Sequence, residues 1–252
     1  FMHQPITLRL LTHTLLLMLL GSLPLAASAE NVLMAFGEKI PPFCFPESDS
    51  GIELEVIGEA LAFKGHKLMP RYYPLARVPL EFKMAHVDAA MTDLGAGAQG
   101  GYFGDPAVLY DNVFVTLTQR ALKISQPADL NGLVVVAFPG AIKRYPEWLT
   151  AVDQAHHYFE QNNQELQVAG LNKGRFDVVL SDKNIFHYFE LQLTRNSLFK
   201  PKAVDMQSFT NVNPNDYRPV FRSEKIRDDF NAGLTQLKAS GRYQAIYDSY
   251  LK

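Results

Sequence analysis

Two stretches of apolar and polar positions give this sequence its α/β character. The first, residues 51–92, is predicted to form a helix, a strand, a second helix and a buried strand. The face of its first helix carries Leu54, Ile57 and Leu61. Residues 174–182 repeat the last part, because a short apolar run again ends in polar residues. A helix that leads into a buried strand is half of a βαβ unit, so the two stretches predict two α/β lobes.

Polar residues follow the apolar run in both predicted strands. They are Thr92 and Asp93 in the first stretch, and Ser181 and Asp182 in the second. In open α/β sheets, ligands bind outside the carboxyl ends of the strands. We therefore expect these four residues to face each other across a cleft between the lobes.

The remaining pattern distributes the chain between the same two lobes. A Val- and Thr-rich strand at residues 112–119 is expected to end the first lobe's N-terminal part, and an apolar strand at 133–137 to open the second. A C-terminal helix is predicted from one apolar stripe at Ile226, Phe230, Leu234 and Leu237. We assign residues 30–118 and 210–252 to lobe 1, and residues 119–209 to lobe 2.

Two loops are expected near the cleft. The segment Pro41–Pro46 contains three prolines, so it is predicted to be a stiff, non-helical loop that carries Phe43. Residues 95–104 are dense in glycine but lack the residues of a P-loop or a dinucleotide fingerprint. We interpret them as a loop that approaches the cleft closely. A packed loop and a plain surface loop, respectively, are the alternatives.

The first 29 residues are predicted to be a secretory signal peptide. Arg9 is their only charged side chain with histidine counted as neutral, and the run from Leu15 to Leu20 is apolar. Ala27-Ser28-Ala29 supplies the small-x-small pattern of a cleavage site. A membrane anchor is the alternative, but the apolar run is shorter than the ~20 residues that a bilayer span needs. We expect a soluble periplasmic protein.

Charge and cysteine content exclude several classes of function. The chain has 24 basic and 26 acidic side chains, so it offers no basic field for nucleic acid and no polybasic membrane patch. Its single cysteine, Cys44, cannot form a disulfide within the chain. Because Cys44 lies between Phe43 and Phe45, we expect a packed, inert thiol.

No motif of catalysis or metal binding is present in the sequence. There is no Gly-x-Ser-x-Gly, no His-Glu-x-x-His and no paired-cysteine site. The adjacent His156 and His157 would point in different directions on a helix. We expect a monomeric protein that is not an enzyme and uses no cofactor or metal.

Six segments, in their order along the chain, resemble the family-3 periplasmic solute-binding proteins of amino-acid ABC importers. They are IPPFCF, GIELEVIGEAL with KGH, LARVPLEFKMAHVDAAMT, ADLNGLVVVAFPG, NKGRFDVVLSD and LTQLKASGRYQAIYDSYL. The resemblance implies the α/β two-lobe fold of type II, the Venus flytrap, with two crossover strands. It also implies that the lobes close on a small polar ligand, with or without an amine, and deliver it to an inner-membrane ABC permease.

The resemblance assigns ligand contacts to individual residues. Asp182 resembles the acidic residue that holds a ligand's ammonium group, and capping of the helix that starts near Asn184 is the alternative. Gly140-Ala141 resembles a Gly-Thr pair whose backbone N–H groups hold an anion, although Ala141 lacks the hydroxyl. Further cleft-lining positions, for which core packing is the alternative, are Phe43, Tyr73 and Phe138.

The sequence departs from the family at the carboxylate site. In the family's amino-acid binders, the region that corresponds to Thr92 is followed in the sequence by an arginine that clamps the ligand's α-carboxylate. Residues 93–119 contain neither arginine nor lysine, so the bidentate partner is missing there. Arg77, in a Pro-x-x-Arg pattern, is the candidate substitute, and a surface or interlobe salt bridge is its alternative.

Two other functions fit the same predicted fold. The lobes could form a ligand-sensing module that reports to a membrane receptor, and no sequence feature separates this from import. The third candidate is a periplasmic dehydratase-like enzyme, since some of these enzymes resemble the fold.

Overall fold

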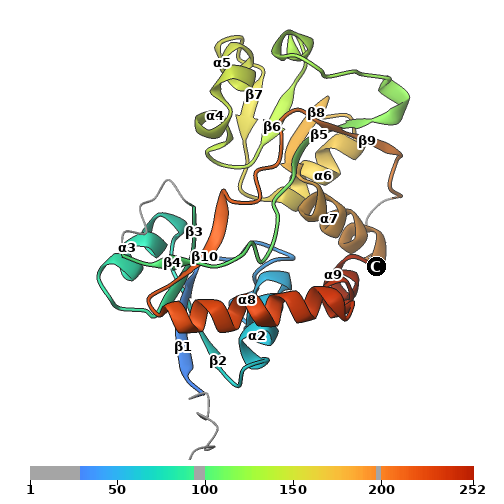
Figure 1. The fold of residues 1–252 in the computed structure, drawn as a ribbon. Helices are drawn as coiled ribbons and strands as arrows, with labels where there is room; N and C mark the ends of the chain where they lie inside the picture. Colours follow the sequence, from blue (N-terminus) through green and yellow to red (C-terminus); the bar gives the residue numbers. More distant parts are fainter. Residues whose placement is uncertain (1–28, 94–99, 197–199) are drawn as a thin grey trace, which may run out of the picture.

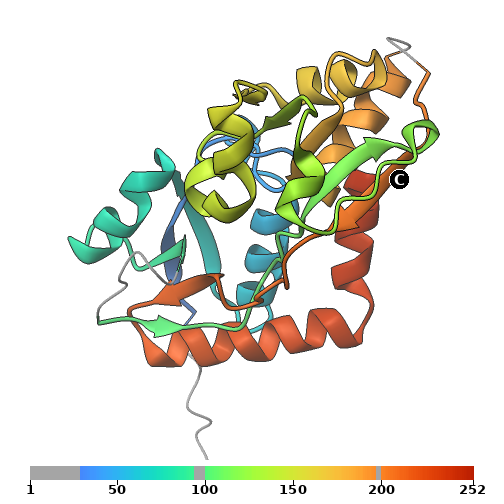
Figure 2. The same ribbon diagram turned by 90° about the horizontal axis from the view of Figure 1, so that it is seen from above.

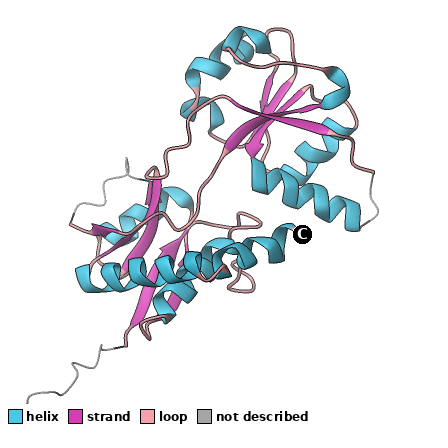
Figure 3. Cartoon of the chain, turned by 45° about the vertical axis from the view of Figure 1, so that its right-hand side comes forward, coloured by secondary structure: helices cyan, strands magenta, loops and turns pink. Residues whose placement is uncertain are grey.

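The computed structural model describes residues 29–93, 100–196 and 200–252. Residues 1–28 of the predicted signal peptide and residues 95–99, half of the glycine-dense loop, lie outside these ranges. The described chain forms two lobes, each built on a five-stranded mixed sheet with helices against it (Figures 1 and 3). None of the helices in these ranges is long and apolar enough to cross a membrane.

The first sheet belongs to lobe 1 and combines parallel and antiparallel pairs. β1 pairs in parallel with β2 and β3, and β10 pairs antiparallel with β3 and β4. In spatial order its strands are β2 (Lys67–Tyr72), β1 (Asn31–Phe36), β3 (Ala89–Asp93), β10 (Tyr217–Phe221) and β4 (Tyr102–Phe103). The helices of this lobe are α2 (Ile52–Ala62), α3 (Val78–Lys83), α8 (Glu224–Ala239) and α9 (Arg242–Leu251), with a 3-10 turn at Leu75–Arg77.

The second sheet belongs to lobe 2 and has the same mixed character. β6 pairs in parallel with β7 and β8, and β5 lies antiparallel between β8 and β9. In spatial order its strands are β7 (Tyr158–Glu160), β6 (Val135–Ala137), β8 (Val178–Asp182), β5 (Asn112–Leu117) and β9 (Val204–Ser208). The helices are α4 (Ala141–Arg144), α5 (Pro146–Gln154), α6 (Gln164–Asn172) and α7 (Lys183–Arg195), with 3-10 turns at Thr118–Arg120 and Pro127–Leu130.

The position of β5 corrects the predicted lobe boundary. The sequence assigned residues 112–118 to lobe 1, but Val113 to Leu117 pair with β8 and β9 of the second sheet. Most side chains of β5 are buried, as expected for an interior strand. Its apolar pattern predicts a strand without specifying which sheet the strand joins. The chain therefore leaves lobe 1 through residues 104–111 and returns through residues 209–216 (Figure 1). We call these segments the first and second connections.

The lobes also meet beside the two connections. Ile185, at the start of α7, packs into the apolar cluster of lobe 1. His187 Nε2 lies 3.0 Å from the carbonyl oxygen of Leu251 on α9. The rings of Phe45 and Tyr188 meet edge to face with centroids 6.0 Å apart. These contacts place one edge of the interlobe region against α7 and α9 (Figure 2).

The proline-rich loop packs against the core of lobe 1. The Cys44 side chain is only 3 % exposed. Burial, with a smaller contribution from the carboxylate of Glu53, raises the pKa of the Cys44 thiol to about 12. The prediction of a packed thiol is confirmed.

Lobe 1 depends on a close approach between α2 and α8, the long helix along its side (Figure 2). Gly233 on α8 faces the backbone of Ala60 on α2. A Cβ atom at position 233 would lie 1.9 Å from the Ala60 carbonyl oxygen. Backbone atoms cannot move aside as a flexible side chain can, so any larger residue must force the helices apart.

We predict that Gly233→Ala lowers the free energy of unfolding by about 1–3 kcal/mol, the usual cost of overpacking. Helix propensity alone would favour alanine by about 1 kcal/mol, so the sign tests the contact directly. Urea unfolding followed by circular dichroism measures the effect. Gln236→Ala, at an exposed position of the same helix, is the control and should stay within about 0.5 kcal/mol of the parent. A Gly233→Ala variant as stable as the parent would contradict the close approach.

Candidate functional site

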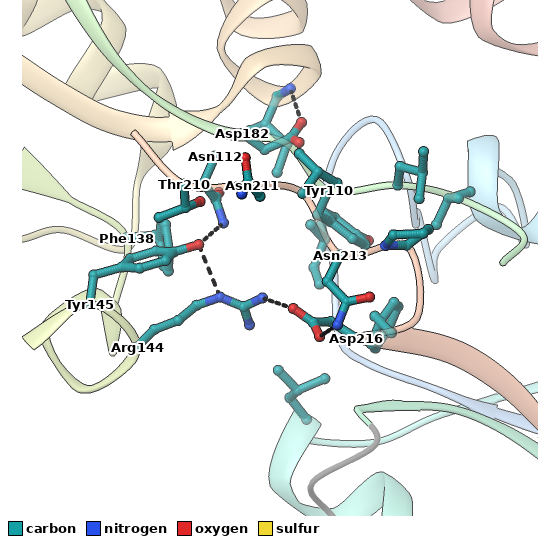
Figure 4. A pocket seen from close by; sticks show the side chains of 18 of the residues that line it. Tyr110, Asn112, Phe138, Arg144, Tyr145, Asp182, Thr210, Asn211, Asn213 and Asp216 are labelled. Atoms are coloured by element: carbon teal, nitrogen blue, oxygen red, sulfur yellow. Dashed lines mark hydrogen bonds and ion pairs between the residues drawn. The ribbon is translucent and has the colours of Figure 1, made fainter. Parts of the chain in front are cut away.

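A cavity of about 670 Å³ lies between the lobes. Both connections contribute to its wall, through Val108 to Tyr110 on the first and through Thr210 to Pro214 and Asp216 on the second. Lobe 1 contributes Ile40, Leu75 and Tyr217, and lobe 2 contributes Asn112, Phe138, Arg144, Tyr145, Glu147, Gln164, Asp182 and Ile185. The side chains labelled in Figure 4 come from lobe 2 and from the two connections. A volume in this range suits a small molecule.

Asp182 lines this cavity and also caps α7. Its Oδ1 accepts hydrogen bonds from the backbone N–H groups of Asn184 and Ile185, at 2.9 and 3.0 Å. Its Oδ2 accepts the N–H of Asp111 at 2.6 Å, which ties the end of the first connection to α7. Burial raises the pKa of the Asp182 carboxyl to about 6, although the three backbone hydrogen bonds lower it. The capping alternative is therefore confirmed, and much of the acceptor capacity of Asp182 is already used.

Gly140 and Ala141 are placed at the start of α4, but their N–H groups are paired within the protein: Ala141 N donates to the Phe138 carbonyl oxygen at 3.2 Å, and a carboxylate accepts from Gly140 N. Glu160 accepts from Gly140 N at 2.8 Å and from Ile142 N at 3.3 Å. Burial alone would raise the pKa of Glu160. The hydrogen bonds from Gly140, Tyr158 and Ile142 outweigh burial and hold this pKa below its usual value. The anion expected from a ligand is thus supplied by β7, and neither Gly140 nor Ala141 lines the cavity.

Arg77 and Tyr73 lie away from the cavity. The Arg77 side chain is 60 % exposed, and its Nε donates to Glu81 Oε1 at 2.7 Å. Its guanidinium lies over the Tyr73 ring, 5.6 Å from the centroid. Neither residue lines the cavity, and the salt-bridge alternative for Arg77 is confirmed. Its i, i+4 spacing from Glu81 on a helix explains this arrangement.

The other predicted site residues are divided between core and cavity. Phe138 lines the cavity. Phe43 is fully buried, with its ring 4.5 Å from that of Tyr110, so it supports the cavity wall from behind. Thr92 and Ser181 are buried and do not line the cavity. Asp93 pairs with Tyr217 in the sheet, and its side chain is not described.

The sequence missed a chain of polar contacts that crosses the cavity (Figure 4). Asn112 Nδ2 donates to Tyr145 Oη at 2.9 Å, and Arg144 Nε donates to the same oxygen at 3.1 Å. Arg144 Nη2 then lies 3.9 Å from Asp216 Oδ2 on the second connection. Arg144 comes only four residues after Gly140, so proximity to the predicted anion site was the signal that could have found it.

A buried carboxyl joins the two connections beneath the cavity. Glu53, in the first turn of α2, is 2 % exposed. Its Oε2 accepts from Tyr110 Oη at 3.1 Å, and its Oε1 accepts from Tyr217 Oη at 3.5 Å. Burial raises the pKa of Glu53 to about 7, although the two tyrosine hydroxyls lower it. Tyr110 belongs to the first connection and Tyr217 directly follows the second, so Glu53 holds the two connections together.

Potential metal ligands do not cluster in the described part of the chain. No group of three or more His, Cys, Asp or Glu residues within it could hold a metal ion. The cavity wall offers hydrogen bonds, apolar surface, the one positive charge of Arg144 and the carboxyl groups of Glu147, Asp182 and Asp216.

We predict that Asp182→Ala lowers the free energy of unfolding by about 1–3 kcal/mol, because α7 loses its cap and Asp111 N loses its acceptor. Asp182→Asn should lose less, since its carbonyl oxygen can still cap the helix. Ser223→Ala is the matched control, because Ser223 caps α8 far from the cavity through Ile226 N at 3.3 Å. Chemical denaturation of the three variants measures the effect. Equal stability of Asp182→Ala and the parent would remove the capping role.

We predict that Glu53→Gln becomes more stable relative to the parent as pH rises. The folded-state pKa of Glu53 is raised, so its contribution to stability is fully present below about pH 4.5 and is lost as pH rises through about 7. Between pH 5 and pH 8 the difference should shift toward the variant by on the order of 2 kcal/mol.

Urea unfolding of both proteins at the two pH values checks this linkage. The control is Glu38→Gln in an exposed loop of the same lobe, which should remain within about 0.5 kcal/mol of the parent throughout. A difference between Glu53→Gln and the parent that does not change with pH would contradict a neutral, buried Glu53 carboxyl.

No family model matches the chain, and no curated protein matches its sequence. Solved structures match it over most of its length. An ancestral cationic amino acid solute-binding protein aligns with a TM-score of 0.65 and 17 % identity, over 88 % of this chain and 96 % of that one.

Two further structures agree with this likeness. The second substrate-binding domain of GlnP from Lactococcus lactis, in an open conformation, aligns with a TM-score of 0.63 and 20 % identity, over 89 % of this chain and 96 % of that one. A histidine kinase sensor domain with similarity to periplasmic binding proteins has a TM-score of 0.60 and 17 % identity, with 88 % and 96 % covered. The structural neighbours thus include family-3 solute-binding proteins, and the chain has the two-lobe α/β fold of periplasmic binding proteins that its sequence predicted.

Proposed function

We propose that this protein captures a small ligand between its two lobes in the periplasm and delivers it to an ABC-type permease in the inner membrane. The observation that carries the proposal is the cavity of about 670 Å³ whose wall includes both lobes and both connections. A ligand there would contact both lobes at once only when they are close together. Binding would therefore shift the lobes toward a closed arrangement, which a membrane partner can recognise.

Binding proteins among the structural neighbours support this reading. Two of them are an amino acid solute-binding protein and a substrate-binding domain of GlnP. The structure of the latter is in an open conformation, which supports a function that includes opening and closing. The predicted signal peptide, the export and the monomeric state remain part of the proposal.

A ligand-sensing module is the second candidate. The similarity to a histidine kinase sensor domain, at a TM-score of 0.60, favours it. Import and sensing use the same closure but different membrane partners. Crosslinking of the ligand-loaded protein to a membrane fraction of its own cell would separate them: a permease supports import, and a sensor kinase supports sensing.

A thermal-shift screen against amino acids, polyamines, small carboxylates and sugars tests capture itself. A ligand at 100 times its dissociation constant should stabilise the fold by about 2.7 kcal/mol. Failure of every compound class, together with no change in lobe separation, would contradict capture of a small molecule.

For a compound that binds, we predict that Asn112→Ala weakens affinity about three- to tenfold, because Asn112 lies in the cavity wall and holds Tyr145. Arg77→Gln should leave affinity within about twofold, since Arg77 lies outside the cavity and pairs with Glu81. Isothermal titration calorimetry measures both. The reverse order of effects would restore the sequence-based assignment of Arg77 to the ligand site.

A further inference from the structure

The groups that the sequence assigned to a zwitterionic ligand are engaged within the protein. Asp182 already accepts three backbone N–H groups. Glu160 occupies the N–H groups of Gly140 and Ile142. Arg77 pairs with Glu81 outside the cavity. Much of the acceptor capacity of the expected ammonium holder is therefore already used, and the expected carboxylate holders are paired within the protein.

Arg144 instead brings a positive charge to the cavity wall. Among the described residues that line the cavity, it is the only one with a positively charged side chain. Its Nε donates to Tyr145 Oη, which fixes the plane of the guanidinium next to the Tyr145 ring. Asn112 holds the same hydroxyl from the other side. The side chain is thus oriented, while its terminal nitrogens face the second connection.

Asp216 is the acidic residue that lies next to the terminal nitrogens of Arg144. Its Oδ2 lies 3.9 Å from Arg144 Nη2, which is too long for a hydrogen bond. Its Oδ1 accepts instead from Asn213 Nδ2 at 2.7 Å. Guanidinium binds a carboxylate best through two parallel N–H···O bonds, and the contact with Asp216 supplies neither. A ligand carboxylate at 2.7–2.9 Å would replace a weak, half-exposed ion pair with a strong one.

The remaining cavity wall combines apolar and aromatic side chains with amides, Thr210 and three carboxyl groups. Besides the rings of Tyr110, Tyr145 and Tyr217, the wall includes Ile40, Leu75, Val108, Leu109, Phe138, Ile185, Val212 and Pro214. Small-molecule sites usually combine such a surface with a few polar groups that fix orientation. The wall therefore suits a ligand with an apolar body and one anionic end.

We infer that the ligand is an organic carboxylate that binds Arg144 through its carboxylate, fills the cavity with an apolar body and needs no ammonium group. This inference rests on the proposed function, since it names the ligand class of the same cavity. The site differs from the amino-acid site that the sequence resembles, because the guanidinium comes from lobe 2 instead of following Thr92 in lobe 1.

Glu147 provides a test of the sign of the ligand's charge. It lies three residues after Arg144 and also lines the cavity. An anionic ligand is repelled by Glu147 and attracted by Arg144, so neutralising these two residues should have opposite effects. A cationic ligand would reverse both effects.

Three compounds with one carbon skeleton isolate the charged groups. They are phenylalanine, 3-phenylpropanoate, which lacks the ammonium group, and phenethylamine, which lacks the carboxylate. Hexanoate, 2-aminohexanoate and pentylamine form the matching aliphatic set. We expect a carboxylate to bind as tightly as or more tightly than its amino acid, and the amine not to bind. Calorimetry and thermal shift on the purified protein measure the affinities.

With the carboxylate that binds, Arg144→Gln should weaken affinity about 10- to 100-fold, the loss of a charge-assisted bidentate contact. Arg144→Lys should recover only part, because lysine lacks the fork. Glu147→Gln should strengthen binding about two- to threefold. Lys143→Gln is the matched control, since this neighbouring cation does not line the cavity, and it should change affinity by less than about twofold.

The outcomes separate this inference from the proposed function. Binding of an amine or an amino acid that survives Arg144→Gln, or failure of both carboxylates, would overturn the inference. If lobe closure still accompanies the ligand that does bind, capture between the lobes stands. Absence of closure with every compound of the broader screen would instead count against the proposed function.

Discussion

The arrangement of the two lobes depends on the buried carboxyl of Glu53, which holds the two connections together. The two lobes have separate sheets and largely separate cores, so their relative position is set by the connections and by the edge contact of α7 with α9. Glu53 binds the hydroxyls of Tyr110 and Tyr217, and the two tyrosine rings meet edge to face at 5.5 Å. The same tyrosines form part of the cavity wall. A buried carboxyl in lobe 1 thus links the two connections to the wall of the cavity.

The chemistry of the cavity follows from which charges are already compensated. A charge that already has its hydrogen bonds gains little from a ligand, because the ligand must compete with existing partners. Asp182 and Glu160 are in that state, since backbone N–H groups at helix starts hold them. The terminal nitrogens of Arg144 lack such a partner at hydrogen-bond distance in Asp216, because that contact is 3.9 Å long. The cavity therefore favours an anion at Arg144.

The fold was accessible from the sequence because its signals are local. The C-terminal helix around Phe230 and the strands that end at Thr92 and Asp182 follow from apolar periodicity alone, and the structure has α8, β3 and β8 there. The sheet that β5 joins was not accessible, because pairing between distant strands leaves no periodic signature. The site was accessible only in part. Phe138 and Asp182 line the cavity, whereas the Arg77 pair with Glu81 and the Glu160 contact with Gly140 depend on tertiary placement.

The distance between the lobes, measured with and without ligand, tests the central claim most directly. Cys44 is buried, so spin labels can be attached selectively at Lys83→Cys on α3 and Asp153→Cys on α5, both exposed positions. Pulsed electron–electron double resonance then measures the distance between the label on lobe 1 and the label on lobe 2. We predict a single distance, shorter than that of the ligand-free protein, when the tightest-binding compound of the screen saturates the protein. An unchanged distance distribution at saturation would contradict closure of the two lobes on a ligand.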